Sequence, residues 1–500
     1  MPSLQLLLAA RRSVSYAFCS RFWATVYLAS QVVQRMTKRN RAIYQRNMNE
    51  RVTIEGRWWI FGADKDPHFG VLSYDPNDST VLTVKIPGEG GIKSLFELFK
   101  QRKYAVQPTI LGADKNNQPV SIFGCYVLNS VASFGQQDFV IHAMMVVCGL
   151  QITAWDELCL DRISAEFTLL HNWVGASNLE VIDGSTTTVT IAELKSAEYA
   201  LDGNVRLNIW PTHAMHHGSG RLIIEEGHRV EFRFAEPRKV KEILLTHVES
   251  FRRFLSLTTG KVVFTDKLYT YAEGGHPEVT FYRGNPGVSG AERKLPHLYM
   301  RASYQQIRAS FGQVINRWYE LESTIDDVLN LYFATIFNRN LYMHQQFLFL
   351  AQALEVYHRT SPNYKNMVQS KAEFRARKKQ IVKAVPSEKD WLNEKLAHAN
   401  EKTLAQRLDD LLTTHADDVS QFIEDTKIFA DSVRHTRNHF THYGTEDEQM
   451  SKVAQGVDLI KITCQMQALL EICIFKDLGI IGEPIARIIK SSNSQSYCSL

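Results

Sequence analysis

The pattern of hydrophobic and polar positions changes near residue 290. Before it, short runs rich in β-branched and aromatic residues are separated by Gly, Pro, Asn and Asp. Two such stretches are "VTIEGRWWIFG" and "GVLSYDPNDSTVLTVKI", the second divided by an Asp-Pro-Asn-Asp turn. These runs predict β-strands, and the second stretch predicts a hairpin. The half from about 52 to 290 is therefore expected to form sandwich-like or barrel-like sheets.

Helical periodicity is found once within this half and dominates after it. Apolar residues keep 3.6-residue spacing over Val240–Thr258, which predicts one helix between strands. After the Gly- and Pro-rich stretch "RGNPGVSGAERKLPH", amphipathic patterns predict helices near 304–337, 341–358, 365–383, 388–396, 402–414, 418–443 and 449–476. The predicted fold class is α+β, with a β-rich N-terminal domain followed by an all-α helical bundle.

Four segments follow from these patterns. Residues 1–49 form a basic N-terminal extension, and residues 50–297 form the β-rich domain, as one unit or two subdomains. The helical domain spans 298–485, and residues 486–500 are predicted to be a flexible tail because they are polar and terminal.

The charge of the chain is uneven. The formal net charge is +4, but residues 1–49 hold eight Arg or Lys and no Asp or Glu. In the remainder, 49 basic residues face 53 acidic ones. Bulk charge therefore does not indicate a nucleic-acid-binding body, and any anion site must be local.

The basic extension admits three interpretations. It resembles a transit peptide in being Arg-rich and free of acids. It could also be a disordered extension, or result from a start codon placed too early, with the working protein beginning near Met48. No segment has a membrane-spanning apolar run, and "FVIHAMMVVCGLQITAW" is expected to form buried strands instead. The seven scattered cysteines form no CxxC pair, which favours a reducing, cytoplasmic location.

The stretch "SVRHTRNHFTHYG" carries the candidate chemistry. Placed at 100° per residue on the predicted helix 418–443, Arg437 borders an apolar stripe that includes Ala430 and Val433. Asn438 and His442 lie on a polar arc beside it, four residues apart, so that the amide could orient the imidazole. An arginine can hold a phosphate bidentately, and a histidine is suited to proton transfer near neutral pH. This set suits chemistry on a phosphodiester, with the 2′-OH of RNA as nucleophile.

Simpler interpretations of the basic stretches remain open. Basic residues in a last helical turn also complement the helix dipole and sit in water. A metal site would need a third ligand beside His435 and His439, and none can be named, so no metal and no cofactor are expected. The run "RARKKQIVK" at 375–383 is either a solvated helix face or a surface that guides RNA.

Three stretches carry a resemblance to a known family. "RNHFTH" at 437–442 resembles the RNxxxH form of the Rx4–6H motif of HEPN-domain ribonucleases. "FLFLAQALEVYHR" at 347–359 and "WLNEKLAHANEKTLAQRLDDLL" at 391–412 resemble the HEPN domain of ApeA-type anti-phage defence proteins. The early "IEGRWWIFG" and "GVLSY" resemble the β-rich domain that accompanies it.

The resemblance implies a metal-independent endoribonuclease that leaves 2′,3′-cyclic phosphate ends. It implies Arg437 and His442 as the catalytic pair, with Asn438 as the polar residue after the arginine and Arg434 as a supporting phosphate contact. Arg434 and His439 also fit the motif as an alternative register. The first register is preferred because it has Asn after the arginine and sets the arginine beside the core.

The resemblance also implies partners. HEPN ribonucleases usually act as homodimers, with the motif helices of two protomers lining one cleft. The substrate would be RNA, such as tRNA or another host RNA, and an unidentified phage-derived trigger would act through the β-rich half as sensor or restraint. Glu355, in "QALEVYHR", could face the cleft or form a helix-surface salt bridge.

Two rival functions differ in class. A HEPN-like module could bind RNA or nucleotide, or scaffold a partner, without catalysis. A transferase is disfavoured because the N-terminal half has no GxGxxG, Walker loop or paired-carboxylate motif.

Overall fold

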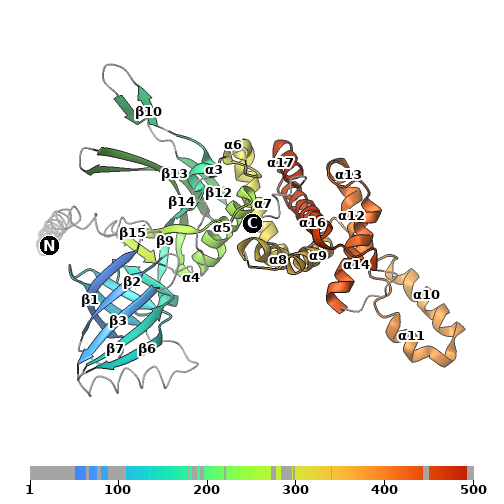
Figure 1. Ribbon diagram of the computed structural model, residues 1–500, viewed down its shortest axis with the longest axis horizontal. Coiled ribbons are helices and arrows are strands. Elements are labelled where there is room, and N and C mark those ends of the chain that lie inside the picture. Colours follow the sequence, from blue (N-terminus) through green and yellow to red (C-terminus); the bar gives the residue numbers. More distant parts are fainter. Residues whose placement is uncertain are drawn as a thin grey trace, which may run out of the picture. The chain divides into compact units, whose positions relative to one another are not determined.

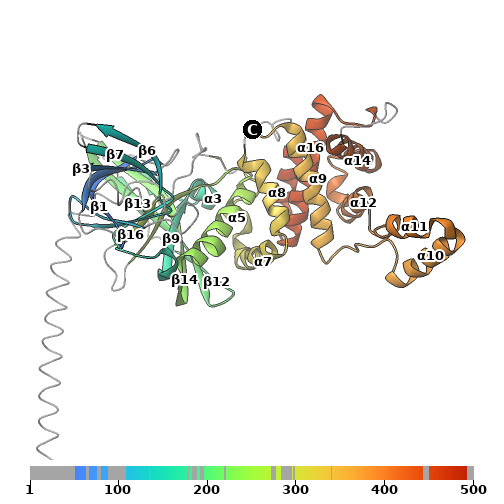
Figure 2. The same cartoon turned by 90° about the horizontal axis from the view of Figure 1, so that it is seen from below.

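A computed structural model describes the chain in segments, which divide into two compact units (Figures 1 and 2). Unit 1 comprises Met1–Phe167, Arg229–Leu244 and Thr265–Gly290, and unit 2 comprises Thr168–His228, Leu245–Phe264 and Ala291–Leu500. The described segments are 51–62, 67–75, 80–87, 109–133, 136–177, 179–182, 188–191, 196–218, 221–271, 278–282, 295–296, 299–338, 340–442 and 450–492. The predicted extension 1–49 and most of the predicted linker 283–297 lie outside them.

Unit 1 is built around an antiparallel sheet. Its strands are β1 (Val52–Ile60), β2 (His68–Tyr74), β3 (Thr80–Pro87), β4 (Ile110–Asp114), β5 (Pro119–Phe123), β6 (Tyr126–Ser133), β7 (Gln136–Ala143), β8 (Met145–Cys148), β9 (Cys159–Phe167), β15 (Thr265–Tyr271), β16 (Glu278–Tyr282) and the second half of β14 (Arg221–Lys239). The hydrogen-bonded order is β14-β9-β15-β16-β8-β5-β4-β1-β2-β3-β7-β6. The predicted hairpin is confirmed, since β2 pairs with β3 from Gly70↔Val84 to Tyr74↔Thr80.

Alternation of buried and exposed positions places one face of this sheet in a core. In β1, Val52, Ile54, Trp58 and Ile60 are buried. Trp58 lies opposite Gly112 of β4, where an added Cβ would come within 2.2 Å of ring atom Cε3. The glycine is therefore required by the indole packed against it. Within the stretch 139–155, strands β7 and β8 are present as expected up to Cys148, whereas residues 149–154 form no strand and a 3₁₀ turn (Trp155–Glu157) follows.

The first part of unit 2 consists of strands and an aromatic core. Its strands are β10 (Leu179–Ile182), β11 (Thr188–Ile191), β12 (Ala197–Leu201), β13 (Val205–Gly218) and the first half of β14. The indole of Trp173, on α3 (Leu170–Val174), donates to the carbonyl of Ala302 at 2.9 Å. Phe254 and Phe311 contact the same ring. This core ties helix α5 (Glu249–Thr259) to the start of the helical bundle.

The predicted helix at Val240–Thr258 is present, with an internal change of winding. It consists of α4 (Val240–Ile243), a π-helical turn (Leu244–Val248) and α5. The remaining helices are α6 (Tyr304–Ile307), α7 (Phe311–Thr324), α8 (Asp326–Phe337), α9 (Met343–Thr360), α10 (Lys371–Ala384), α11 (Lys389–Lys395), α12 (Leu404–Thr414), α13 (Ala416–Val419), α14 (Thr426–His442), α16 (Gly456–Asp477) and α17 (Glu483–Ser492). The β-rich region followed by an all-helical region confirms the predicted fold class.

α16 is the central helix of this bundle. Fourteen of its residues are buried, and α9 and α17 pack against it. The carboxylate of Glu471, fully buried on α16, accepts hydrogen bonds from Tyr332 at 2.7 Å and from Arg301 at 3.2 Å. A buried carboxylate paired in this way holds α8 and the residues before α6 in fixed register with α16.

Two predicted elements need correction. The predicted helix 418–443 is broken, because α13 ends at Val419 and α14 begins at Thr426. The predicted flexible tail from 486 is wrong up to Ser492, because Ile485, Ile488 and Ile489 are buried on α17. Among the residues that the structure describes, no helix is long and apolar enough to cross a bilayer.

Candidate active site

The candidate residues lie on α14, and the sequence explains where this helix begins and how it is held. The Asp425 carboxylate accepts hydrogen bonds from the backbone N–H groups of Lys427 and Ile428, both at 2.9 Å, which caps the first turn. Val433 and Thr436 are fully buried, and the Thr436 hydroxyl accepts the N–H of Ala454 at 2.8 Å. α14 packs against α9 and α12, so that its last turns are presented on a fixed scaffold.

Arg437 is half-buried beside these core positions, as the helical projection predicted. Its Nη2 atom lies 4.0 Å from Oε2 of Glu355 on α9, and its Nη1 atom donates to Oδ1 of Asn438 at 3.3 Å. Glu355 also accepts from Arg359, one turn further along α9, at 2.9 Å. The structure therefore brings Glu355 beside Arg437, with its carboxylate shared between two guanidinium groups.

The other motif residues differ in their exposure and in their contacts with neighbouring side chains. His442 is exposed at the end of α14. Arg434 donates from Nη2 to Asp431 at 3.1 Å and lies 2.8 Å from Nε2 of His435, so that its guanidinium is tied to its own helix. His439 packs edge-on against Phe440, with ring centroids 5.5 Å apart. Arg437 has one contact with its own helix, to Asn438, and Arg434 has two, while the two side chains are about equally exposed, at 40% and 41%.

Two details of the projection are wrong. At 100° per residue, His435 falls about 160° from Arg437, close to His442, but it is 7% exposed because α14 packs against two helices. Asn438 does not orient His442 among the described contacts, since its amide oxygen accepts from Arg437 instead. The polar surface of the motif is therefore narrower than the sequence suggests, and it centres on Arg437, Asn438 and His442.

A buried polar network next to this surface was missed by the sequence reasoning. Arg407 of α12 is 1% exposed and donates from Nη1 to Nδ1 of His358 at 3.0 Å and to Asn366 at 2.7 Å. His358 Nε2 lies 2.6 Å from Asp410, which also pairs with Lys402. The bond from Arg407 leaves Nδ1 as acceptor, so the ring is neutral with its proton on Nε2.

The electrostatics of the network agree with that tautomer. Burial lowers the pKa of His358 below its usual range, although the hydrogen bond to Asp410 opposes this. Burial acts to raise the pKa of Asp410, but the hydrogen bonds from Lys402 and His358 outweigh it and lower the pKa. The one sequence signal for the network is the capping box Thr403–Gln406, which begins α12 and sets Arg407 in its first turn.

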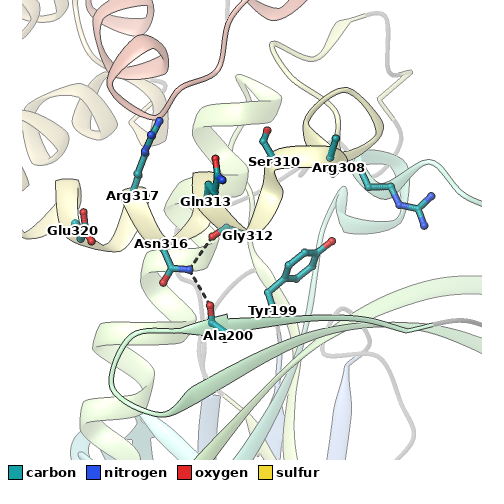
Figure 3. Close-up of a pocket in the computed structure, with 10 residues that line it drawn as sticks. Tyr199, Ala200, Arg308, Ser310, Gly312, Gln313, Asn316, Arg317 and Glu320 are labelled. Atoms are coloured by element: carbon teal, nitrogen blue, oxygen red, sulfur yellow. Dashed lines mark hydrogen bonds between the residues drawn. The ribbon is translucent and has the colours of Figure 1, made fainter.

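Unit 2 also has an open surface pocket of about 620 Å³ between β12 and α7, away from the motif residues in the sequence (Figure 3). Its lining includes Tyr199, Arg308, Asn316 and Arg317. Figure 3 shows the two arginine side chains pointing away from each other, while Asn316 is committed to the carbonyls of Ala200 and Gly312. The polar groups do not converge on one ligand position, so this pocket is not the stronger candidate site.

No three His, Cys, Asp or Glu side chains in the described segments are grouped so that they could hold a metal ion. The donor set at the motif is instead one carboxylate, one amide, an imidazole and guanidinium groups. Such a set is suited to binding an anion and moving a proton.

Comparison with models of protein families shows which family the chain belongs to. The family model described as ApeA N-terminal domain 1 matches residues 53–318, more than half of the chain. The chain belongs to the ApeA family. A second model, described as Apea-like HEPN, matches residues 348–483. No curated protein and no solved structure matches the chain.

The Apea-like HEPN region runs from α9 to the start of α17 and contains every candidate residue named above. The ApeA N-terminal match extends past the sheets to α7. HEPN domains are commonly ribonucleases, and the two matches together indicate a nuclease-like protein of anti-phage defence. The boundaries 50–297 and 298–485 stay predictions.

Proposed function

We propose that the chain is a metal-independent HEPN endoribonuclease that acts in the cytoplasm in abortive-infection defence. The observation that supports it most is the position of Arg437, Asn438 and His442. They lie at the end of α14 within the Apea-like HEPN region, with Asn438 and His442 exposed and Arg437 half-buried beside Glu355 of α9.

The proposed reaction uses a nucleophile from the substrate. The 2′-OH of a ribose attacks the adjacent phosphorus, the bond to the 5′-oxygen of the next nucleotide breaks, and a 2′,3′-cyclic phosphate remains. His442 removes the 2′-OH proton or donates one to the leaving oxygen. Arg437 and Asn438 hydrogen-bond the non-bridging phosphate oxygens as their charge grows, and Arg434 contributes a further contact. Glu355 holds the Arg437 guanidinium in place before RNA binds.

The helix geometry supports a dimeric site. Residues five apart on an α-helix differ by about 140° in direction and about 7.5 Å in height. Arg437 and His442 of one α14 therefore leave the helix on different sides, and a second α14 facing the first would supply the complementary pair. Mixing Arg437→Ala with His442→Ala protein would then restore activity, to about a quarter of wild type if heterodimers form at random. Additive, unrestored activities would contradict the shared site.

The cleavage itself is tested with purified full-length protein and total RNA in EDTA. We expect 2′,3′-cyclic phosphate ends from the wild type, and losses of about 10²–10⁴-fold in Arg437→Ala and His442→Ala. His439→Ala is the matched control, since it removes a neighbouring imidazole of the same helix and belongs to the alternative register. Undiminished cleavage in both variants would contradict the proposal and favour a non-catalytic RNA-binding module.

The β-rich region is proposed to sense a phage-derived trigger or restrain the nuclease. Its support is the ApeA N-terminal match alone. The test compares phage protection and growth arrest in cells expressing wild type, His442→Ala and a chain altered in the sheet surface. Unchanged protection and growth arrest in the sheet-surface variant would contradict the sensor or restraint role, and protection that persists in His442→Ala would contradict defence by RNA cleavage.

A further inference from the structure

Helices α10 and α11 form a hairpin inserted between α9 and α12. Figures 1 and 2 both show it standing out from the neighbouring helices of unit 2. No residue from Lys371 to Lys395 is buried, and the two helices pack mainly against each other, with Lys378 Nζ donating to the carbonyl of Asn393 at 3.1 Å. An element with so little core of its own is not explained by a contribution to the stability of the bundle.

One face of α10 carries a ladder of four cations. Lys371, Arg375, Lys379 and Lys383 are spaced by four residues, so that neighbours differ by about 40° in direction and the ladder covers about 18 Å of helix. None of the four has a carboxylate partner among the described residues. The single acid of α10, Glu373, is instead used in the capping box with Ser370.

The ladder lowers the stability of the helix that carries it. Like charges four residues apart destabilise a helix by about 0.2–0.5 kcal/mol per pair. Lys371 also stands in the first turn, where a cation opposes the helix dipole, and only Lys383 lies at the favourable end. The ladder is therefore a positively charged surface without carboxylate partners. Because it lowers the stability of its own helix, we expect it to bind an anionic partner.

The base of the hairpin is joined to the candidate active site. Asn400 clamps it, accepting the N–H of Gln369 and donating to its carbonyl, both at 3.0 Å. Asn366 donates to the carbonyl of Arg359 at 2.8 Å and accepts from the buried Arg407. Arg359 shares the Glu355 carboxylate with Arg437. A short chain of direct contacts therefore runs from the hairpin to the motif helix.

We infer that the α10–α11 hairpin is an RNA-docking arm that holds single-stranded substrate by its phosphate backbone. The cation ladder binds successive phosphates, and Trp391 of α11, 55% exposed, offers a ring on which a base stacks. The choice of RNA as the anion rests on the proposed function. The arm adds a binding surface distinct from the residues that cut.

The test measures binding of a fluorescent, unstructured single-stranded RNA to full-length protein carrying His442→Ala, so that the probe is not cut. The ladder variant is Arg375→Gln with Lys379→Gln. The control is Arg377→Gln with Lys395→Gln, which removes the same charge from the same arm; Arg377 lies about 200° around α10 from Arg375. We expect about tenfold weaker binding in the ladder variant, and a salt dependence reduced by about 1.4 in log–log slope.

The control should bind RNA like the parent, and Trp391→Leu should weaken binding while keeping the salt slope. Equal losses in ladder and control, unchanged binding in the ladder variant, or binding of an acidic polypeptide in place of RNA would each overturn the inference. The outcome is independent of catalysis. If the wild type binds RNA through the ladder yet never cuts it, the proposed function fails and the arm stands.

Discussion

Helices α14 and α10 both carry clustered basic residues, but they differ in burial and in the partners of their cations. On α14, Arg434 and Arg437 each have a hydrogen-bonded or acidic neighbour, and the helix is fixed by buried residues such as Val433. On α10, no residue is buried and the ladder cations have no acidic partner in the described chain. A positioned arginine suits transition-state stabilisation, whereas exposed cations without an acidic partner suit binding of a phosphate backbone. Similar runs of basic residues therefore indicate different functions once their burial and their ion-pair partners are known.

The largest expected effect separates rate from binding. His442→Ala should lower kcat by about 10²–10⁴-fold with a small change in KM, because it removes a proton-transfer group. Arg375→Gln with Lys379→Gln should leave kcat near wild type and raise KM about tenfold, because it removes phosphate contacts. Steady-state cleavage of a defined single-stranded RNA measures both. A fall in kcat in the α10 variant would show that the arm takes part in the chemistry and would break the contrast.

The second contrast concerns stability. Phe429 of α14 is 5% exposed, so Phe429→Ala should lower the free energy of unfolding by about 3–5 kcal/mol. Phe374 of α10 is only half-buried, and Phe374→Ala should cost about 1 kcal/mol. Urea unfolding of the two variants beside the wild type gives the comparison. Equal costs would mean that the arm is as much a part of the core as α14.

A pH effect is expected at the base of the arm. Burial lowers the pKa of His358, so the folded state binds this proton less readily than the unfolded chain. Its contribution to stability is complete above its ordinary pKa of about 6.5 and falls as the pH drops below it. Thermal unfolding from about pH 7.5 to about pH 5.5 should show this loss, and His358→Gln should lose less.

His228 and His415 serve as the internal reference for that experiment. Burial lowers the pKa of both, that of His228 to about 4, so the wild-type curve falls with acid in either case. Only the difference in pH dependence between wild type and His358→Gln measures the contribution of His358 at the base of the hairpin. Parallel curves would show that the network of Arg407 and Asp410 tolerates a protonated His358.

The smallest expected effect is at Glu355. Its pair with Arg437 is partly exposed, with 4.0 Å between the charged atoms, so the pair contributes at most about 1 kcal/mol. Glu355→Gln should therefore change kcat by less than about tenfold, and added salt should reduce the difference. Glu388→Gln, on the exposed turn after α10, is the matched control. A loss as large as that of His442→Ala would make Glu355 part of the reacting set.

The sequence predicted most of the fold because its patterns are local. Strand alternation, the Asp-Pro-Asn-Asp turn and the capped helices each depend on a few neighbouring residues, and the β2–β3 hairpin and α9, α10 and α12 lie close to their predicted ranges. The break before Thr426 was missed because Val419 and Ile423 are both buried and continue the apolar spacing up to it. The Ile423 N–H still donates to the Val419 carbonyl at 2.9 Å, and the helix resumes only at Thr426.

The candidate site was less predictable because it depends on contacts between helices. The edge position of Arg437 followed from one helix alone. The burial of His435 and the network of Arg407 and His358 did not, since they depend on how α9, α12 and α14 pack. Nothing in the letters around Arg407 distinguishes a buried arginine from an exposed one.

The most direct measurement is the single-turnover rate of RNA cleavage in EDTA for wild type, His442→Ala and His439→Ala. We expect cyclic phosphate ends from the wild type, a rate about 10²–10⁴-fold lower in His442→Ala, and a rate close to wild type in His439→Ala. A wild-type rate in His442→Ala, with or without a loss in His439→Ala, would contradict the assignment of Arg437 and His442 as the pair that cuts RNA.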